Sequence, residues 1–194
     1  MVETKVNKAE IIEEAVQSLL SQKIDTAAHI ISSRYPFRPN QRVNRSYSIL
    51  EKAMTFYRDG FIDRYTGDKL VHPAILRILS LSCPNEFPYQ KHWKLNETHI
   101  AYWELMPTID HITPIALGGK DNMDNWITTS MLHNSIKSSW TLEQLNWVIQ
   151  KEGNIEQWDG LTSLFFALIQ NNSEYLKDSY VKSWYQASVK VFQK

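Results

Sequence analysis

The sequence predicts an α+β fold, a mainly helical chain around a small core of a two-stranded hairpin followed by a helix. Apolar residues recur at helical spacing near both ends of the chain, and a Gly-Gly turn separates two short β-prone runs in its middle. A stretch without glycine or proline follows the second run. We expect a helical N-terminal region (1–60), a core (61–140) and a helical C-terminal region (141–194) that packs on the core.

Three helices are expected in the N-terminal region. Asn7, with a glutamate three residues later, forms a capping signal ahead of aliphatic residues that predict a helix over about 8–22. Asp25 is a candidate cap for a second helix, which ends before Pro36 because the residue that precedes a proline avoids the α region. An arginine-bearing loop and a third helix over 46–58 follow.

The segments on either side of the core are expected to be mixed. A proline at its start favours a helix over 73–80, prolines and the lack of a clear period favour irregular structure over 84–96, and residues 99–105 are a candidate strand. After the core, a capping box predicts a helix over 141–151. Two more helical patterns follow, over 159–170 and 173–193.

Two short β-prone runs form the predicted hairpin. Asp110 and His111 lie in an apolar run that ends at Pro114, which indicates a short strand because proline lacks the N–H that a ladder needs. Turn residues over 117–122 precede a β-branched and aromatic run over 126–129, which is typical of a second strand returning beside the first. We therefore expect a hairpin with a long, polar loop.

A short helix is expected directly after the hairpin. Ser130 is a suitable N-cap, and residues 131–138 contain no glycine or proline. Asn134 and Lys137 are three apart and share a face of this helix, while His133 and Lys137 are four apart and partly share one. Strand and helix together bring four polar side chains within reach of one another: Asp110, His111, Asn134 and Lys137.

These residue types suit metal-assisted hydrolysis of a phosphodiester. Carboxylate and amide oxygens are ligands of the kind that Mg²⁺ takes, and proteins hold this ion by few groups together with water and phosphate. A neutral histidine accepts a proton from water near neutral pH. Lys137 is a candidate contact for a phosphate oxygen, and the alternative is a solvated lysine near a helix end.

In this order the residues resemble the HNH nuclease family, whose core is a hairpin followed by a helix that grips one metal ion, the ββα-metal arrangement. The resemblance covers about residues 61 to 140 and implies a metal-dependent endonuclease with Mg²⁺ as its cofactor and Mn²⁺ as a substitute. The matching positions are Asp110-His111-Ile112-x-Pro114, Gly118-Gly119, Asp124-Asn125 and His133-Asn134-x-x-Lys137.

The resemblance also implies a role for each matching position. His111 is the general base toward water, and Asp110 beside it binds the metal. Asn125 holds the hairpin and the histidine ring in place. Asn134 binds the metal, and His133 is its rival because a shift of the helix by one residue exchanges the two.

Residues 63–70 resemble the turn that precedes the hairpin in many members of the family, where a cysteine pair often belongs to a structural zinc site. Cys83 is the only cysteine of this chain, so a four-cysteine site within one chain is excluded and no structural zinc is expected. The hairpin is then expected to depend on apolar packing for its support.

The composition is that of a folded protein without a membrane partner. The 194 residues are 43% hydrophobic and carry no net charge, no apolar run approaches the roughly 18 residues of a membrane span, and the polar start is unlike a secretory signal. We expect a cytoplasmic location. Residues 34–77 hold nine basic and four acidic residues, an excess of five, which favours contact with DNA. The candidate contacts are Arg38, Arg42, Arg45 and Arg64.

The leading hypothesis is a metal-dependent endonuclease of the restriction or defence type that hydrolyses double-stranded DNA. One alternative is a nucleic-acid-binding module that keeps the fold without cleavage. Another is an RNase with the same site, because one-metal hydrolysis needs no feature of the sugar. Cutting both strands ordinarily requires two active sites and hence a homodimer, whereas a monomer more naturally nicks.

Overall fold

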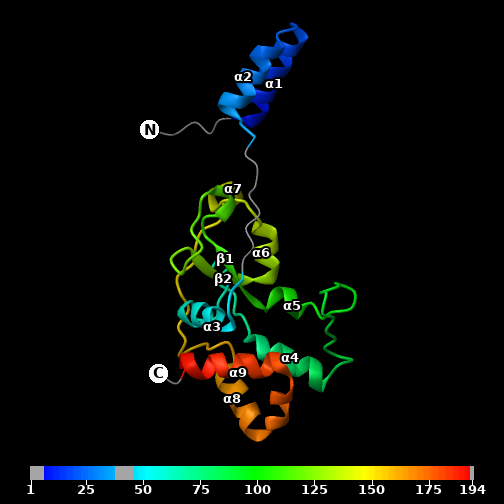
Figure 1. Ribbon diagram of the computed structural model, residues 1–194, viewed down its shortest axis with the longest axis vertical. Coiled ribbons are helices and arrows are strands. Elements are labelled where there is room, and N and C mark those ends of the chain that lie inside the picture. Colours follow the sequence, from blue (N-terminus) through cyan, green and yellow to red (C-terminus); the bar gives the residue numbers. More distant parts are fainter. Residues whose placement is uncertain (1–6, 38–45, 193–194) are drawn as a thin grey trace. The chain divides into compact units, whose positions relative to one another are not determined.

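The computed structural model describes residues 7–37 and 46–192. These residues form an α+β protein with one two-stranded antiparallel sheet among helices (Figure 1). The chain divides into two compact units, one up to residue 41 and the other from residue 42 onward. Among the described helices, none has the length and apolar character needed to cross a membrane.

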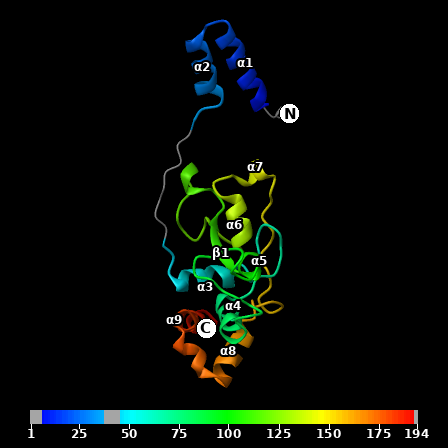
Figure 2. The same cartoon turned by 90° about the vertical axis from the view of Figure 1, so that its right-hand side faces the viewer.

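The first unit is a helical hairpin of α1 (Lys8–Leu20) and α2 (Ile24–Arg34), which run side by side in both views (Figures 1 and 2). Asn7 caps α1, because its side chain accepts a 3.1 Å hydrogen bond from the backbone N–H of Ala9. The predicted first helix and its cap are confirmed. The second helix begins one residue before Asp25, so this carboxylate lies in the first turn and not at the cap. In the first turn its negative charge interacts favourably with the helix dipole.

The second unit contains a helical layer around an aromatic core. In this layer α3 (Ile49–Arg58) packs along α9 and also contacts both strands. The boundary between the units therefore lies near residue 41 and not at the expected residue 60, because the apolar face of α3, with Phe56, is buried in the second unit. The other members of the layer are α4 (Pro73–Ser82), α8 (Thr162–Asn171), η2 (Ser173–Lys177) and α9 (Ser179–Phe192).

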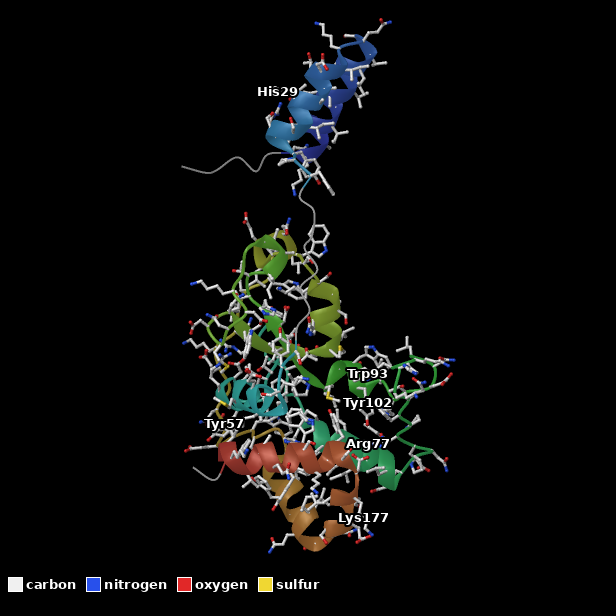
Figure 3. All side chains as sticks on the ribbon, in the orientation of Figure 1. His29, Tyr57, Arg77, Trp93, Tyr102 and Lys177 are labelled. Carbon is white, nitrogen blue, oxygen red and sulfur yellow. The ribbon has the colours of Figure 1, made fainter. Side chains whose placement is uncertain are left out.

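Aromatic side chains join these helices across long stretches of sequence. Phe56 stacks on Trp184 with ring centroids 6.0 Å apart, and Tyr57 meets Phe192 edge-on at 4.5 Å. Tyr57 lies on the side of α3 that faces α9 (Figure 3). The C-terminal helices thus share one core with α3 and α4.

The hairpin and its helix lie where the sequence places them. Strand β1 (Pro107–His111) pairs antiparallel with β2 (Trp126–Ser130), and α6 (Met131–Lys137) follows at once. Ser130 caps α6 by accepting a 3.1 Å hydrogen bond from the backbone N–H of His133. A 3-10 turn, η1 (Ile115–Leu117), opens the loop between the strands. The predicted hairpin, cap and helix are confirmed.

The expected strand over 99–105 is wrong. The segment holds a helical turn, α5 (Ala101–Glu104). Nδ1 of His99, just before this turn, accepts a 3.2 Å hydrogen bond from the N–H of Ala101. Tyr102 is buried, and its hydroxyl donates to the carbonyl of Leu76. Burial of the ring, and not strand pairing, accounts for its apolar and aromatic composition. Figure 3 shows Tyr102 beside Trp93 and Arg77.

The helix expected over 141–151 is much shorter than predicted. The capping box is present, but α7 (Leu142–Leu145) ends at Asn146, which takes a left-handed conformation (φ +57°). The chain after Asn146 is not helical, and the N–H of Gln150 donates to the carbonyl of Arg64 at 2.7 Å. A long-range backbone contact replaces the remaining turns of the expected helix.

Candidate functional site

His111 ends β1 and is 1% exposed. Its Nε2 lies 2.8 Å from Oδ1 of Asp121, while its Nδ1 is buried and has no hydrogen-bond partner within the described part of the chain. A carboxylate accepts the proton of Nε2, so the tautomer with a lone pair on Nδ1 is favoured. In that tautomer the lone pair of Nδ1 is not used by a hydrogen bond from any described residue.

Asp121 is the site residue that the sequence reasoning missed. Its Oδ1 accepts from Nε2 of His111 and from Nε1 of Trp126, both at 2.8 Å, and lies 3.4 Å from the hydroxyl of Tyr47. Burial raises the pKa of Asp121, but these hydrogen bonds outweigh it, so the pKa lies below its ordinary value. In the sequence Asp121 stands among turn-forming residues, and no spacing distinguishes it from them.

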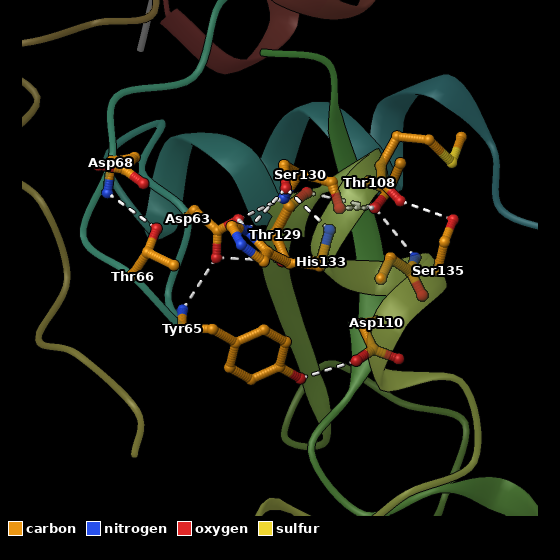
Figure 4. A network of polar contacts seen from close by, with 12 residues as sticks. Asp63, Tyr65, Thr66, Asp68, Thr108, Asp110, Thr129, Ser130, His133 and Ser135 are labelled. Atoms are coloured by element: carbon orange, nitrogen blue, oxygen red, sulfur yellow. Dashed lines mark hydrogen bonds and ion pairs between the residues drawn. The ribbon is translucent and has the colours of Figure 1, made fainter. Parts of the chain in front are cut away.

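Asp110 is buried beside His111 at 5% exposure. Its Oδ2 accepts a 2.7 Å hydrogen bond from the hydroxyl of Tyr65 and lies 3.0 Å from Nζ of Lys137 (Figure 4 shows the contact with Tyr65). Burial raises the pKa of the Tyr65 hydroxyl far above its ordinary value, so this group is a permanent donor. Tyr65 comes from the turn before the hairpin, which thereby reaches the site.

Lys137 is fully buried, although the sequence predicted either a phosphate contact or a solvated lysine. Its ammonium donates to the backbone carbonyl of His111 at 2.7 Å and pairs with Asp110 at 3.0 Å. The geometry therefore supports neither a contact with a phosphate nor a solvated lysine. A buried charge is stable only when it is paired and hydrogen-bonded, and the end of β1 supplies both conditions.

Asn134 and His133 take different neighbours. The amide of Asn134 donates through Nδ2 to Oγ1 of Thr108 at 2.9 Å and to the carbonyl of Ile109 at 3.1 Å, so it lies against β1 next to Asp110. Nδ1 of His133 instead lies 2.7 Å from a carboxylate oxygen of Asp63. Of the two rivals, the geometry places Asn134 nearer in the fold to Asp110.

Asn125 closes the loop of the hairpin. Its Oδ1 accepts from the N–H of Thr113 at 2.8 Å, and its Nδ2 donates to the carbonyls of Thr113 at 2.9 Å and Lys120 at 2.8 Å. Gly119 fits this loop because a Cβ there would stand 1.9 Å from the Thr113 oxygen. Asn125 holds the hairpin as expected, whereas the hydrogen bond that holds the histidine ring comes from Asp121.

A buried carboxylate connects the turn before the hairpin with the start of α6. Asp63 is 0% exposed and accepts from the N–H groups of Tyr65 at 2.9 Å and Ser130 at 2.8 Å, from Oγ1 of Thr129 at 3.0 Å, and contacts His133 (Figure 4). Burial raises its pKa, and the hydrogen bonds lower it further than burial raises it. The expectation of purely apolar support for the hairpin is corrected: buried polar groups hold it.

Asp59 is a second buried carboxylate that holds β2, and it also pairs with Arg64. Its Oδ2 accepts from the N–H of Thr128 at 2.7 Å, and its Oδ1 lies 2.9 Å from Nη1 of Arg64. Arg64 is 7% exposed and also donates to the carbonyl of Gln150, so its expected role as a DNA contact is corrected to a structural one.

Other basic residues of the 34–77 segment are used within the protein as well. Each described arginine pairs with a carboxylate: Arg34 with Glu14, Arg58 and Arg64 with Asp59, and Arg77 with Asp178. The remaining candidates, Arg38, Arg42 and Arg45, lie outside the described residues. The basic excess of this segment is thus partly neutralised by folding.

The chemistry of the donor set fits a hard ion such as Mg²⁺. Over residues 7–37 and 46–192, no three histidine, cysteine, aspartate or glutamate side chains gather as a metal site. One carboxylate and one amide are nevertheless enough when water and phosphate complete the shell. Asp110 uses Oδ2 in the contacts above and Asn134 uses Nδ2, so the oxygens left to them are Oδ1 of each.

No family model, no curated protein and no solved structure matches this chain. The residues and their geometry therefore carry the functional argument.

Proposed function

We propose that this chain is a metal-dependent endonuclease that hydrolyses DNA phosphodiester bonds with an HNH-type core. The observation that carries the proposal is the environment of His111: a buried ring with Nε2 on a carboxylate and Nδ1 without a partner. Asp110 precedes it on the same strand, and Asn134 lies against that strand. This is the composition of a site with a general base beside two oxygen ligands.

The residues divide the chemistry among them. Nδ1 of His111 takes the proton of the attacking water, and the carboxylate of Asp121 stabilises the imidazolium that forms. Oδ1 of Asp110 and of Asn134 would hold Mg²⁺ or Mn²⁺, which offsets charge on the phosphate and on the leaving oxygen. Lys137 fixes the carbonyl of His111 and so the place of the base. The products carry a 5′-phosphate and a 3′-hydroxyl.

A specific observation favours a second candidate, a module that binds nucleic acid without cutting it. The ammonium of Lys137 already stands 3.0 Å from the carboxylate of Asp110. A paired carboxylate attracts a further cation less strongly than an unpaired one does. In this alternative the hairpin keeps its shape, and the polar cluster serves stability alone.

Cleavage of supercoiled plasmid by the full chain, with Mg²⁺ or Mn²⁺ and with a chelator, tests the proposal. We expect nicked or linear product only with the metal. His111→Ala should cleave about 10²- to 10⁴-fold more slowly, the contribution typical of a general base, and should bind duplex DNA as the parent does. His92→Ala is a matched control, because His92 is an exposed histidine outside the site.

Each other outcome selects a different reading. Equal cleavage by the parent and His111→Ala would overturn the general base. A parent that binds duplex DNA but never cuts it, with either metal, would support the second candidate. Faster cleavage of an RNA strand than of the matching DNA strand would identify an RNase with the same site.

A further inference from the structure

The helical hairpin of the first unit carries one open apolar face, which we call the α1/α2 face. On α1, aliphatic residues recur at positions 12, 16, 19 and 20, and on α2 at positions 24 and 31. All are exposed, from 40% for Ile31 to 81% for Leu20. The α1/α2 face consists of Ile12, Val16, Leu19, Leu20, Ile24 and Ile31.

Both stripes lie on the same side of the hairpin. Ile11 and Ala15 of α1 and Ala27 of α2 are buried, so they mark the line where the two helices meet. At about 100° per residue, both exposed stripes are turned in the same sense from that line. In an antiparallel pair, equal turns point to the same side, so the two stripes form one continuous surface.

Acidic side chains avoid the α1/α2 face, and the basic Lys8, four residues before Ile12, lies at its edge at the start of α1. The ion pair between Glu14 and Arg34 lies on the other side of the line of contact, because Glu14 is turned from the buried Ala15 in the opposite sense. Glu10 is turned in that sense from Ile11 as well. Two such faces brought together therefore oppose apolar groups to apolar groups and set no carboxylates against each other.

This hairpin buries too little to be stable without a partner surface. Its described helices have 13 and 11 residues, and only three of their side chains are buried. Isolated helices of this length are marginal in water and depend on packing of an amphipathic face. A covered α1/α2 face supplies that packing.

We propose that the α1/α2 face is a homodimer interface, in which two hairpins stack into a four-helix bundle. Spacings of three and four residues are those of a bundle core. The six side chains expose on the order of 600 Å² per copy, so a dimer removes about 1,200 Å², which reaches the lower end of stable protein interfaces. The proposal does not depend on the nuclease proposal, since it concerns only the first unit.

The mass of the full chain in solution tests the dimer. Light scattering after size exclusion should give twice 22.7 kDa, about 45 kDa, at tens of micromolar. Val16→Glu with Leu20→Glu should give 22.7 kDa. The matched control places the same two charges on exposed positions of the polar side, Gln17→Glu with Ser33→Glu, and should remain dimeric.

Three results would overturn the proposal: a monomeric parent, a parent of higher order than a dimer, or a dimer that persists in Val16→Glu with Leu20→Glu. If the parent is monomeric and the amides of α1 and α2 resist hydrogen exchange, the second unit and not a second copy covers the α1/α2 face. Circular dichroism of both variants establishes that the second unit stays folded. If the nuclease proposal also holds, the monomeric variant should nick plasmid without producing linear DNA, a result that the mass measurement does not need.

Discussion

Two buried histidines in the second unit have opposite surroundings. His72 and His111 are each 1% exposed. Both ring nitrogens of His72 are bonded: Nδ1 accepts from the N–H of Ala74 at 3.2 Å, and Nε2 lies 2.9 Å from the hydroxyl of Ser188. His111 has one bonded nitrogen, whose partner is a carboxylate, and one without a partner.

The difference separates a structural histidine from a candidate catalytic one. His72 caps α4 and stacks on Phe165 at 4.7 Å within the aromatic core. Burial lowers its pKa to about 3, so it is neutral at physiological pH and has no lone pair to offer. His111 stands at the end of a strand beside Asp110 and keeps a lone pair. Burial alone therefore does not mark a candidate site; what distinguishes His111 is a nitrogen unpartnered among the described residues, opposite a nitrogen bonded to a carboxylate.

The largest effect on stability should come from lowering the pH of the solution, because His72 must then take up a proton on unfolding. The folded pKa is about 3 and the unfolded value is about 6.5, so below pH 6.5 the unfolded state binds more protons. The contribution of His72 to the free energy of unfolding is fully present above pH 6.5. It falls toward pH 3 by about 1.4 kcal/mol per pH unit, several kcal/mol in all. Urea denaturation between pH 4 and pH 7 measures it.

His72→Asn is the matched variant, because asparagine also caps helices and does not titrate. Its stability should be nearly constant between pH 4.5 and pH 6.5, whatever its absolute value. Buried carboxylates such as Asp63 have lowered pKa values and add their own loss only below about pH 4 in both proteins. Parallel slopes for parent and variant in the upper window would show that His72 is not the titrating group.

The next effect should come from the ion pair that holds the strand end at His111. Lys137→Met leaves the buried carboxylate of Asp110 without its cation, which typically costs about 3–5 kcal/mol of unfolding free energy. Adding Asp110→Asn removes the unpaired charge and should restore a large part of that loss. Urea denaturation of the parent, the single and the double variant measures both steps. Equal stability of the single and double variants would mean that the pair is not what Lys137 contributes.

The smallest effect should come from replacing the residues that bond Nε2 of the two histidines. Comparing these replacements sharpens the difference between His111 and His72. Asp121→Ala should lower kcat of cleavage roughly 10- to 100-fold with little change in KM, because Asp121 orients His111 and does not touch substrate. Asp121→Asn keeps an acceptor and should lose less. Ser188→Ala, the counterpart at His72, should leave cleavage unchanged. Cleavage by Asp121→Ala at the parent rate would remove Asp121 from the site.

Local sequence signals predicted the local parts of the site. The strands around Asp110 and Trp126, the cap at Ser130 and the shared face of Asn134 and Lys137 all follow from residue types within a few positions of one another. Propensity, capping and helical spacing act over this range, so these predictions needed no knowledge of the rest of the chain.

Only the tertiary structure decided how those residues are used. Lys137 is buried because Asp110 and the His111 carbonyl, 27 and 26 positions away, solvate its charge. The carboxylate of Asp63 is buried because Ser130, 67 positions away, supplies a donor to it. The cost of burying a charge depends on partners that sequence spacing does not reveal. The sequence by itself determined the hairpin, its helix and the order of the polar residues, and the fold decided which of them face each other.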